Sequence, residues 1–273
     1  MKLLLDIGNT HSHIGICTAR RISRDANIPT DDWQKKHANK WLVDFIGKAN
    51  VGQAIVCSVV PAATRHAVKV LRKMGIAIHE LTHKNCGMQI DYPRPSSIGA
   101  DRLANARAGL DEFGSPLIVV DFGTAVTFDI VDDQGKYVGG VIAPGLSAMT
   151  DYLHENTALL PKIKLRDPRT VIGKNTRQAM QIGAVHGYRG LVQGLVREIK
   201  SSLRSRRLSV VATGGYASLI ARHVRKVNLQ KLPVVVMGDL NCLAGSEPYQ
   251  AFQQGGLQDA LPRTETKHQG PLS

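Results

Sequence analysis

The sequence lacks any apolar run long enough to cross a bilayer, and its cysteines are few and scattered. A membrane-spanning helix needs about 18 or more apolar residues in succession. The N-terminal run Leu3–Leu5 is interrupted by Asp6 and is also too short for a signal-peptide core. Cys17, Cys57, Cys86 and Cys242 show neither close pairing nor the spacing of a metal site. We therefore expect a cytoplasmic protein with reduced thiols and no membrane partner.

Acidic residues are also scarce, with 22 Asp and Glu against 35 Lys and Arg, for a formal net charge of +13. Nine basic residues and one acid lie between Arg197 and Lys231, so this stretch alone carries +8. Such a stretch can bind phosphate backbones through counterion release. However, no zinc-finger spacing, RNA-binding aromatic motif or helix-turn-helix signature accompanies it. We interpret it as a solvated basic face that helps to attract anionic substrates, and we expect no nucleic acid partner.

Two segments, 3–16 and 118–129, share one design in which an apolar run ends in Asp, bends through Gly and continues as an alternating apolar run. Each segment predicts a strand, a tight turn and a second strand, and their similarity indicates an internal duplication or two equivalent roles. Glycine lets backbone N–H groups approach a ligand, and the Asp can hold a cation beside phosphate oxygens. Each hairpin is thus a candidate half of a nucleotide-phosphate site, although an ordinary turn would explain one copy alone.

The rest of the chain alternates between strand and helix patterns, which is typical of an α/β protein. Expected helices cover 33–46, 61–74 and 99–108, follow Pro144–Gly145, begin at Asn175 or Thr176, and cover 217–223. Expected strands cover 54–60, 76–78, 137–142, 208–213 and 233–237, while 82–97 and 156–172 are irregular. A Gly pair, Gly214–Gly215, lies where a strand meets a helix and would permit close approach of a flat ligand or a phosphate.

The longest expected helix carries four glycines on one face: Gly183, Gly187, Gly190 and Gly194. Each glycine in a helix costs about 1 kcal/mol relative to alanine, so a compensating interaction is expected. Close packing of another helix would provide it, and the sequence leaves open whether that helix comes from the same subunit or from the partner in a dimer.

Four motifs, in chain order, resemble those of the type III pantothenate kinases: Asp6–Thr10, Gly99–Arg102, Asp121–Ala125 and Ala212–Gly215. The resemblance extends to Ser58–Pro61, Gly139–Gly140, Pro144–Leu146, Thr157–Pro161 and Gly173–Thr176, and so covers about residues 2–220. This family belongs to the acetate and sugar kinase, Hsp70 and actin superfamily. The resemblance implies an α/β fold of two duplicated ribonuclease-H-like domains, 1–113 and 114–252, with ATP in a cleft between them. It also implies a homodimer whose interface helps to build the pantothenate site, and residues 253–273 are expected to form a disordered tail.

The resemblance further implies the roles of individual residues. Asp101 is expected to be the proton acceptor, and Asp121 is expected to bind a monovalent cation, K⁺ or NH₄⁺. ATP, accompanied by Mg²⁺, is expected to contact Thr124 and a first phosphate loop made of Asp6, Ile7, Gly8, Asn9, Thr10, His11, Ser12 and His13. Pantothenate is expected to contact Tyr92, Gly99, Ala100, Asp101, Arg102 and Thr176. Without the family, Asp101 and Arg102 would be interpreted as a helix-start acid and a surface ion pair.

The sequence departs from the family pattern in two places. The first loop is unusually rich in His at 11–13. The usual Leu-Thr-Leu-x-Gly-Leu ending is replaced by a segment at 239–245 that resembles it only loosely, and we expect an altered helix there.

The expected reaction is ATP-dependent phosphorylation of pantothenate to 4′-phosphopantothenate, the first step of coenzyme A biosynthesis. A non-enzymatic regulator on the same fold, favoured by the basic stretch, and a sugar or acid kinase of the wider superfamily are the alternatives.

Overall fold

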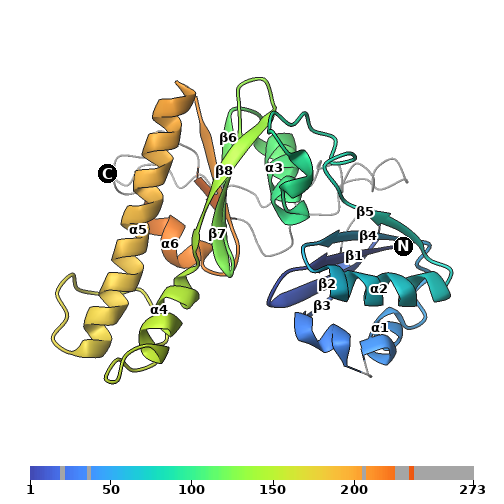
Figure 1. The fold of residues 1–273 in the computed structure, drawn as a ribbon, viewed down its shortest axis with the longest axis horizontal. Coiled ribbons are helices and arrows are strands. Elements are labelled where there is room, and N and C mark those ends of the chain that lie inside the picture. The colour runs from blue at the N-terminus through green and yellow to red at the C-terminus, as the bar shows by residue number, and fades with distance from the viewer. Residues whose placement is uncertain (19–21, 36–37, 205–206, 225–233, 237–273) are drawn as a thin grey trace, which may run out of the picture.

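The computed structural model describes residues 1–18, 22–35, 38–204, 207–224 and 234–236, which form two five-stranded sheets (Figure 1). The first sheet has the order β3-β2-β1-β4-β5, with β1 (Lys2–Ile7), β2 (His11–Cys17), β3 (Ile22–Pro29), β4 (Gln53–Ser58) and β5 (Ala77–Glu80). The second has the order β10-β9-β6-β7-β8, with β6 (Leu117–Phe122), β7 (Ala125–Val131), β8 (Tyr137–Pro144), β9 (Ser209–Thr213) and β10 (Val234–Val236).

The two sheets share one topology. In each, three consecutive strands form an antiparallel meander, and its first strand also pairs in parallel with a later strand, which pairs in parallel with the last. Strands β1 and β6 occupy the same central position in this order, and each ends at one of the predicted turns. The shared strand order confirms the predicted duplication and the α/β fold class.

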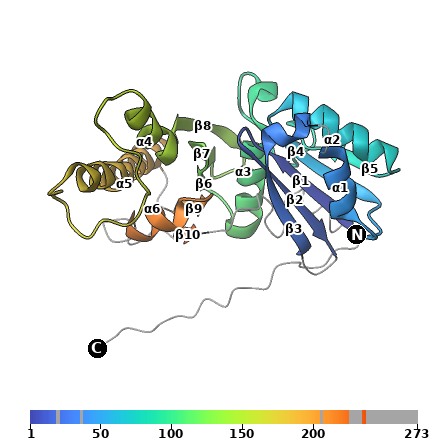
Figure 2. The ribbon, with the colours of Figure 1, turned by 90° about the horizontal axis from the view of Figure 1, so that it is seen from below.

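Helices cover the sheets so that three apolar cores form. Helices α1 (Ala38–Ile46) and α2 (Pro61–Lys73) pack on the first sheet, and α5 (Thr176–Leu203) and α6 (Ala217–Val224) pack on one face of the second. Helix α3 (Ala100–Phe113) packs on the opposite face of the second sheet and also contacts β4 of the first. Both views place α3 between the two sheets (Figures 1 and 2). Helix α4 (Leu146–Glu155) and the short 3₁₀ helices η1 (Thr30–Gln34) and η2 (Pro95–Ser97) complete the elements of the described residues.

Local sequence explains where the main helices begin and end. Helix α2 starts with Pro61, which is favourable in the first turn because its missing N–H would have no helical partner there. The Asn175 Oδ1 accepts a hydrogen bond of 3.0 Å from the Gln178 N–H, as expected of an N-cap, which confirms the predicted start of α5. Helix α3 ends at Gly114, whose N–H donates to the Leu110 carbonyl at 2.9 Å.

One sequence expectation was wrong, and one strand was not predicted. The pattern over 33–46 is not one helix, because Trp33 lies in η1, the chain is extended at Lys35, and α1 begins only at Ala38. Strand β3 was not predicted, since it is mostly exposed and polar and carries little apolar alternation. The tail at 253–273 and the altered helix near 239–245 lie outside the described residues, and the domain boundary after residue 113 stays a prediction. Within the part of the chain that is described, no helix is long and apolar enough to span a membrane.

Candidate active site

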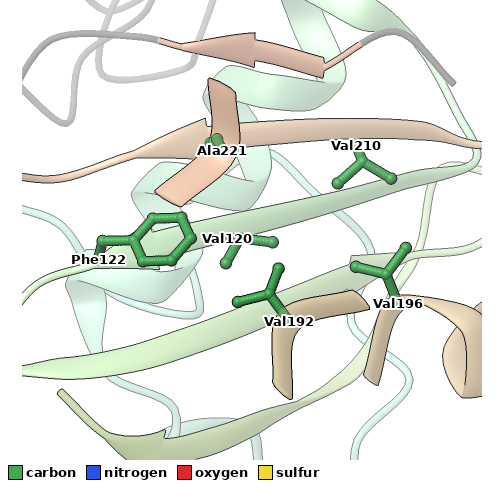
Figure 3. Close-up of a pocket in the computed structure, with 7 residues that line it drawn as sticks. Val120, Phe122, Val192, Val196, Val210 and Ala221 are labelled. Carbon is green, nitrogen blue, oxygen red and sulfur yellow. The ribbon is translucent and has the colours of Figure 1, made fainter. Parts of the chain in front are cut away.

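A small apolar pocket lies in the core of the second sheet, on the side covered by α5 and α6 (Figure 3). It is lined only by Val, Phe and Ala side chains: Val120, Phe122, Val192, Val196, Val210, Ala212 and Ala221. Such a lining has no side-chain donor for a phosphate and no group that can exchange a proton. The pocket therefore belongs to the packing of the core, and the predicted site residues lie elsewhere.

The two predicted phosphate turns meet directly. The hydroxyl of Thr10, in the β1–β2 turn, and that of Thr124, in the β6–β7 turn, are 2.8 Å apart and share a hydrogen bond. Both residues are exposed, as are Asn9 and Gly123 beside them. The first turn is closed by a 3.0 Å hydrogen bond from the Gly8 N–H to the His11 carbonyl. Segments more than 100 residues apart in the chain thus present two hydroxyl groups at one place.

The first loop has side chains of two kinds. Those of Ile7 and Ser12 are fully buried, and the Ser12 hydroxyl accepts from the Trp33 indole N–H at 2.9 Å and pairs with the Thr30 hydroxyl at 3.0 Å. These two residues can offer a nucleotide only their backbone. Asp6 and His13 face each other across the β1–β2 pair on the half-buried side of the sheet. The eight predicted residues therefore fall into two groups, core positions and positions that are open to a ligand.

Asp101 lies in the first turn of α3, next to the end of the first sheet. A methyl group at Gly99 would overlap its Oδ1 and would also come within 3.3 Å of Val59, whose N–H donates to the Ile7 carbonyl at 3.1 Å. Burial raises the pKa of the Asp101 carboxyl, although its hydrogen bond from the Arg102 N–H, at 2.8 Å, and the Arg102 charge act in the opposite direction. A carboxylate with a raised pKa is a stronger base than an ordinary Asp.

Asp121 lies at the end of β6, and α3 holds it from one side. The Asn105 amide, one helical turn after Asp101, donates to Asp121 Oδ2 at 2.9 Å. On the other side, the turn after β9 comes so close that a methyl group at Gly214 would overlap Asp121 Oδ1 and the Phe122 backbone. The carboxylate is half-buried with its position fixed, and its oxygen atoms suit a hard cation. The residues present therefore fit the predicted cation site.

Arg102 extends from α3 to the second sheet. Its Nε donates to Oδ1 of the fully buried Asp129 at 2.7 Å, and the Tyr137 hydroxyl donates to the same oxygen at 3.0 Å. Burial raises the pKa of Asp129 to about 7 against the effect of the Arg102 charge, and burial together with the Asp129 charge raises the pKa of Tyr137. Burial lowers the pKa of Arg102, but the Asp129 charge and hydrogen bond, together with Tyr137 and Asp101, raise it above its ordinary value, so the guanidinium stays charged. The predicted Tyr92 packs edge-on against Tyr137, with ring centroids 6.5 Å apart.

Thr176 is the predicted site residue that the structure does not bring to this cluster. It is the first residue of α5, and both views show that end of α5 on the far side of the second sheet from α3 (Figures 1 and 2). Within one chain, the structure brings together the two predicted phosphate turns, Asp101, Arg102 and Asp121, and it places Tyr92 beside Tyr137.

The sequence interpretation assigned no role to Asn105, Asp129 or Tyr137. A signal existed for two of them. Asn105 is a polar residue at a helix position between apolar neighbours, and Asp129 interrupts the apolar alternation of β7 on the face toward α3. The contact between Tyr137 and Asp129 depends on the β7–β8 pairing and has no comparable signal in the sequence.

Two duplicated sheets whose Asp-x-Gly turns meet define a protein of the actin-like ATPase fold. A solved structure of an archaeal actin homologue agrees with this, with a TM-score of 0.50 at 10% identity, covering 93% of this chain and 99% of that one. The profile of the type III pantothenate kinase family matches residues 2–198. The type III pantothenate kinase of Akkermansia muciniphila is 42% identical over 245 residues, which cover 89% of this chain and 98% of the relative. That of Acidiphilium cryptum is 39% identical, covering 83% and 88% respectively. The chain belongs to the type III pantothenate kinase family, as its motifs predicted.

Proposed function

We propose that this protein transfers the γ-phosphoryl group of ATP to the terminal hydroxyl of pantothenate, the first step of coenzyme A biosynthesis. The observation that carries the proposal is the hydrogen bond between Thr10 and Thr124, which joins the two phosphate turns beside α3. Family membership supports the identity of the substrates. The geometry supports the type of chemistry, because phosphoryl transfer depends mostly on positioning and on charge stabilisation.

In this proposal, different residues bind the two substrates. The turns at Gly8–Thr10 and Gly123–Thr124 offer the hydroxyl groups of Thr10 and Thr124 to the phosphates of ATP, while Arg102 and Tyr92 bind pantothenate. Asp101 accepts the proton of the pantothenate hydroxyl as that oxygen forms its bond to the γ-phosphorus and the bond to the ADP oxygen breaks. Because burial raises the pKa of Asp101, the carboxylate is better matched to this task than an ordinary Asp.

Two cations accompany the reaction in this proposal: a divalent ion that arrives with ATP and a monovalent ion held by Asp121. Both would neutralise phosphate charge. The fixed orientation of Asp121, between Asn105 and the turn at Gly214, supports its assignment as the monovalent ligand. We also propose that the enzyme works in the cytoplasm, as its reduced-thiol pattern suggests.

A coupled assay of ADP formation tests the function directly. We expect ADP to form only when ATP, Mg²⁺ and pantothenate are all present, with phosphopantothenate detected by mass spectrometry in equal amount. Turnover of sugars or short-chain acids instead would favour another kinase of the superfamily. Salt-sensitive DNA binding without any turnover would favour the regulator.

Removing the Asp121 carboxylate should remove the dependence on the monovalent cation. We expect Asp121→Asn to lower kcat/KM at saturating K⁺ by at least about tenfold, because a neutral amide binds a cation more weakly. The variant should also show no further activation between K⁺-free buffer and saturating K⁺. The matched control is Asp132→Asn, which changes a carboxylate in the turn after β7. Strong K⁺ activation in Asp121→Asn would exclude this carboxylate as the ligand.

The glycine face of α5 supports the proposed homodimer. Gly183, Gly187 and Gly190 are exposed, and none of the four glycines has a described atom within 4 Å of an added Cβ. The described part of the subunit therefore provides no helix packed on this face. A second subunit would compensate for the glycines, since small residues let two helices approach closely. Because Thr176 begins the same helix, a partner could bring its Thr176 to the pantothenate site.

Substitutions at Gly187 and Gly190 test whether a second subunit packs on the glycine face of α5. If a second subunit packs there, replacing both with Leu should give a folded monomer, detected by light scattering, with pantothenate turnover reduced at least about tenfold. Replacing both with Ala is the sharper test. On a free face, alanine should raise stability by about 1 kcal/mol per site, whereas in an interface it should weaken the dimer. A dimeric and fully active Leu variant would refute the interface.

A further inference from the structure

Among the described residues, the Arg102 side chain is held through its Nε. Its Nε donates to Asp129 Oδ1 at 2.7 Å, and the side chains of the two residues are 14% and 0% exposed. Asp129 comes from β7, whereas Arg102 comes from the first turn of α3, so this pair joins the helix that carries the proposed base to the second sheet. A buried ion pair orients its partners when the remaining polar atoms are also hydrogen-bonded.

The Asp129 carboxylate meets that condition. The Tyr137 hydroxyl donates to Oδ1 at 3.0 Å, and the Thr127 hydroxyl donates to Oδ2 at 3.3 Å. Tyr137 is itself fully buried, and its ring contacts that of Tyr92. Three hydrogen bonds from three elements thus fix the carboxylate, and through it they fix the position of the Arg102 guanidinium.

The neighbouring nitrogen of the guanidinium, Nη2, is different. The Nη2 of Arg102 is buried, yet it has no hydrogen-bond partner among the described residues. It lies against Gly140, where a methyl group would overlap both Nη2 and the Phe128 carbonyl. Buried donors in proteins nearly always have a partner. A donor that lacks one, on the residue next to the proposed base, is therefore available to an oxygen of the substrate.

We propose that Asp129 is a positioning residue, which with Tyr137 holds Arg102 at its Nε so that Nη2 donates to an oxygen atom of bound pantothenate. This inference rests on the proposed function and adds to it a residue that touches no substrate. Gly140 contributes by leaving the space that Nη2 occupies. The role belongs to the pantothenate half of the site, because the phosphate turns make none of these contacts.

Asp129→Asn tests the role of the charge, since the amide oxygen can still accept from Nε but no longer attracts it as an ion. We expect the KM for pantothenate to rise at least about tenfold, with the KM for ATP within about twofold of wild type. Tyr137→Phe, which removes one hydrogen bond to Asp129, should raise the KM for pantothenate about threefold. The matched control is Asp111→Asn. It alters a second Arg–Asp pair on α3, formed with Arg107, whose side chains are 14% and 11% exposed, and should leave both KM values unchanged.

A double-mutant cycle with Arg102→Lys shows whether Asp129 acts through Arg102. Lysine lacks the guanidinium edge that Asp129 holds, so adding Asp129→Asn to Arg102→Lys should raise the KM for pantothenate by less than about twofold more. Effects that multiply independently would mean a merely structural role and would overturn the proposal. If Asp129→Asn does not fold, Tyr137→Phe decides, and an unchanged KM overturns the positioning. Absence of pantothenate turnover in the wild type would overturn the function itself, and the positioning with it.

Discussion

Replacing Asp101 with Asn is expected to lower kcat by at least about 100-fold while ATP still binds. General-base catalysis contributes about 10² to 10⁴ in rate, and the asparagine amide cannot accept the proton. Its oxygen can still accept from the Arg102 N–H, so the first turn of α3 should keep its geometry. Turnover is measured by ADP release, and nucleotide affinity by calorimetry. Turnover within about threefold of wild type would remove Asp101 as the base.

Stability distinguishes loss of the base from loss of the fold. The folded pKa of Asp101 is raised above the ordinary value of 3.8. A raised pKa means that the ionised form is disfavoured in the folded state, so stability falls as the pH rises above 3.8, and the loss is complete once the pH exceeds the folded pKa. Asp101→Asn should therefore melt at the same temperature as the wild type or higher at neutral pH. The control Asp111→Asn, on the same helix, should retain full turnover.

The same shift sets the acid side of the pH profile. Asp101 must be ionised to accept a proton, so kcat/KM should fall as the pH falls through its raised pKa. The acid limb is thus expected above pH 3.8, the position of an ordinary Asp. The pKa of Asp129 is raised to about 7, so its ionisation should give the KM for pantothenate a second and weaker dependence on pH. Asp129→Asn should lack this dependence. Arg102, Tyr137 and Asp101 are the titratable groups that act on Asp129.

The sequence predicts most of the features whose cause is local. The hairpins at β1–β2 and β6–β7 follow from an alternation that is visible within about twelve residues, and the start of α5 follows from Asn175. Strand β3 was not predicted because an exposed edge strand has no buried face to produce an apolar alternation. The helix expected over 33–46 failed because Trp33 is drawn into the core by a 3₁₀ turn rather than by an α-helix.

The site could be predicted as a set of motifs but not as a network. The resemblance supplied Asp101, Arg102 and Asp121 as separate residues, and nothing in the spacing indicates that Asn105 would join α3 to Asp121. The pair between Arg102 and Asp129 likewise depends on α3 packing across the second sheet. Contacts of this kind arise from tertiary packing, and no periodic pattern within a short stretch of the sequence predicts them. The position of Thr176 shows the same limit, since one chain does not bring it to the site.

In the Gly214–Gly215 pair, the first position is sterically constrained and the second is not. Alanine substitutions at the two positions should therefore differ in their effect. The sequence suggested close approach of a ligand at this turn, whereas the structure shows Gly214 approaching Asp121 and the Phe122 backbone. Gly214 also has a φ of +89°, which an L-residue adopts only at a cost of about 1 to 2 kcal/mol. Overlap with fixed backbone adds about 1 to 3 kcal/mol.

Gly214→Ala should therefore lower the free energy of unfolding by about 2 to 5 kcal/mol, measured by urea denaturation, and should weaken K⁺ activation by displacing Asp121. Gly215→Ala is the matched control. An added Cβ at Gly215 meets no described atom within 4 Å, and the change should stay within about 0.5 kcal/mol. Equal effects at the two sites would contradict the close approach of this turn to Asp121. A destabilised Gly214→Ala that keeps full K⁺ activation would show that the turn supports the fold without orienting the cation ligand.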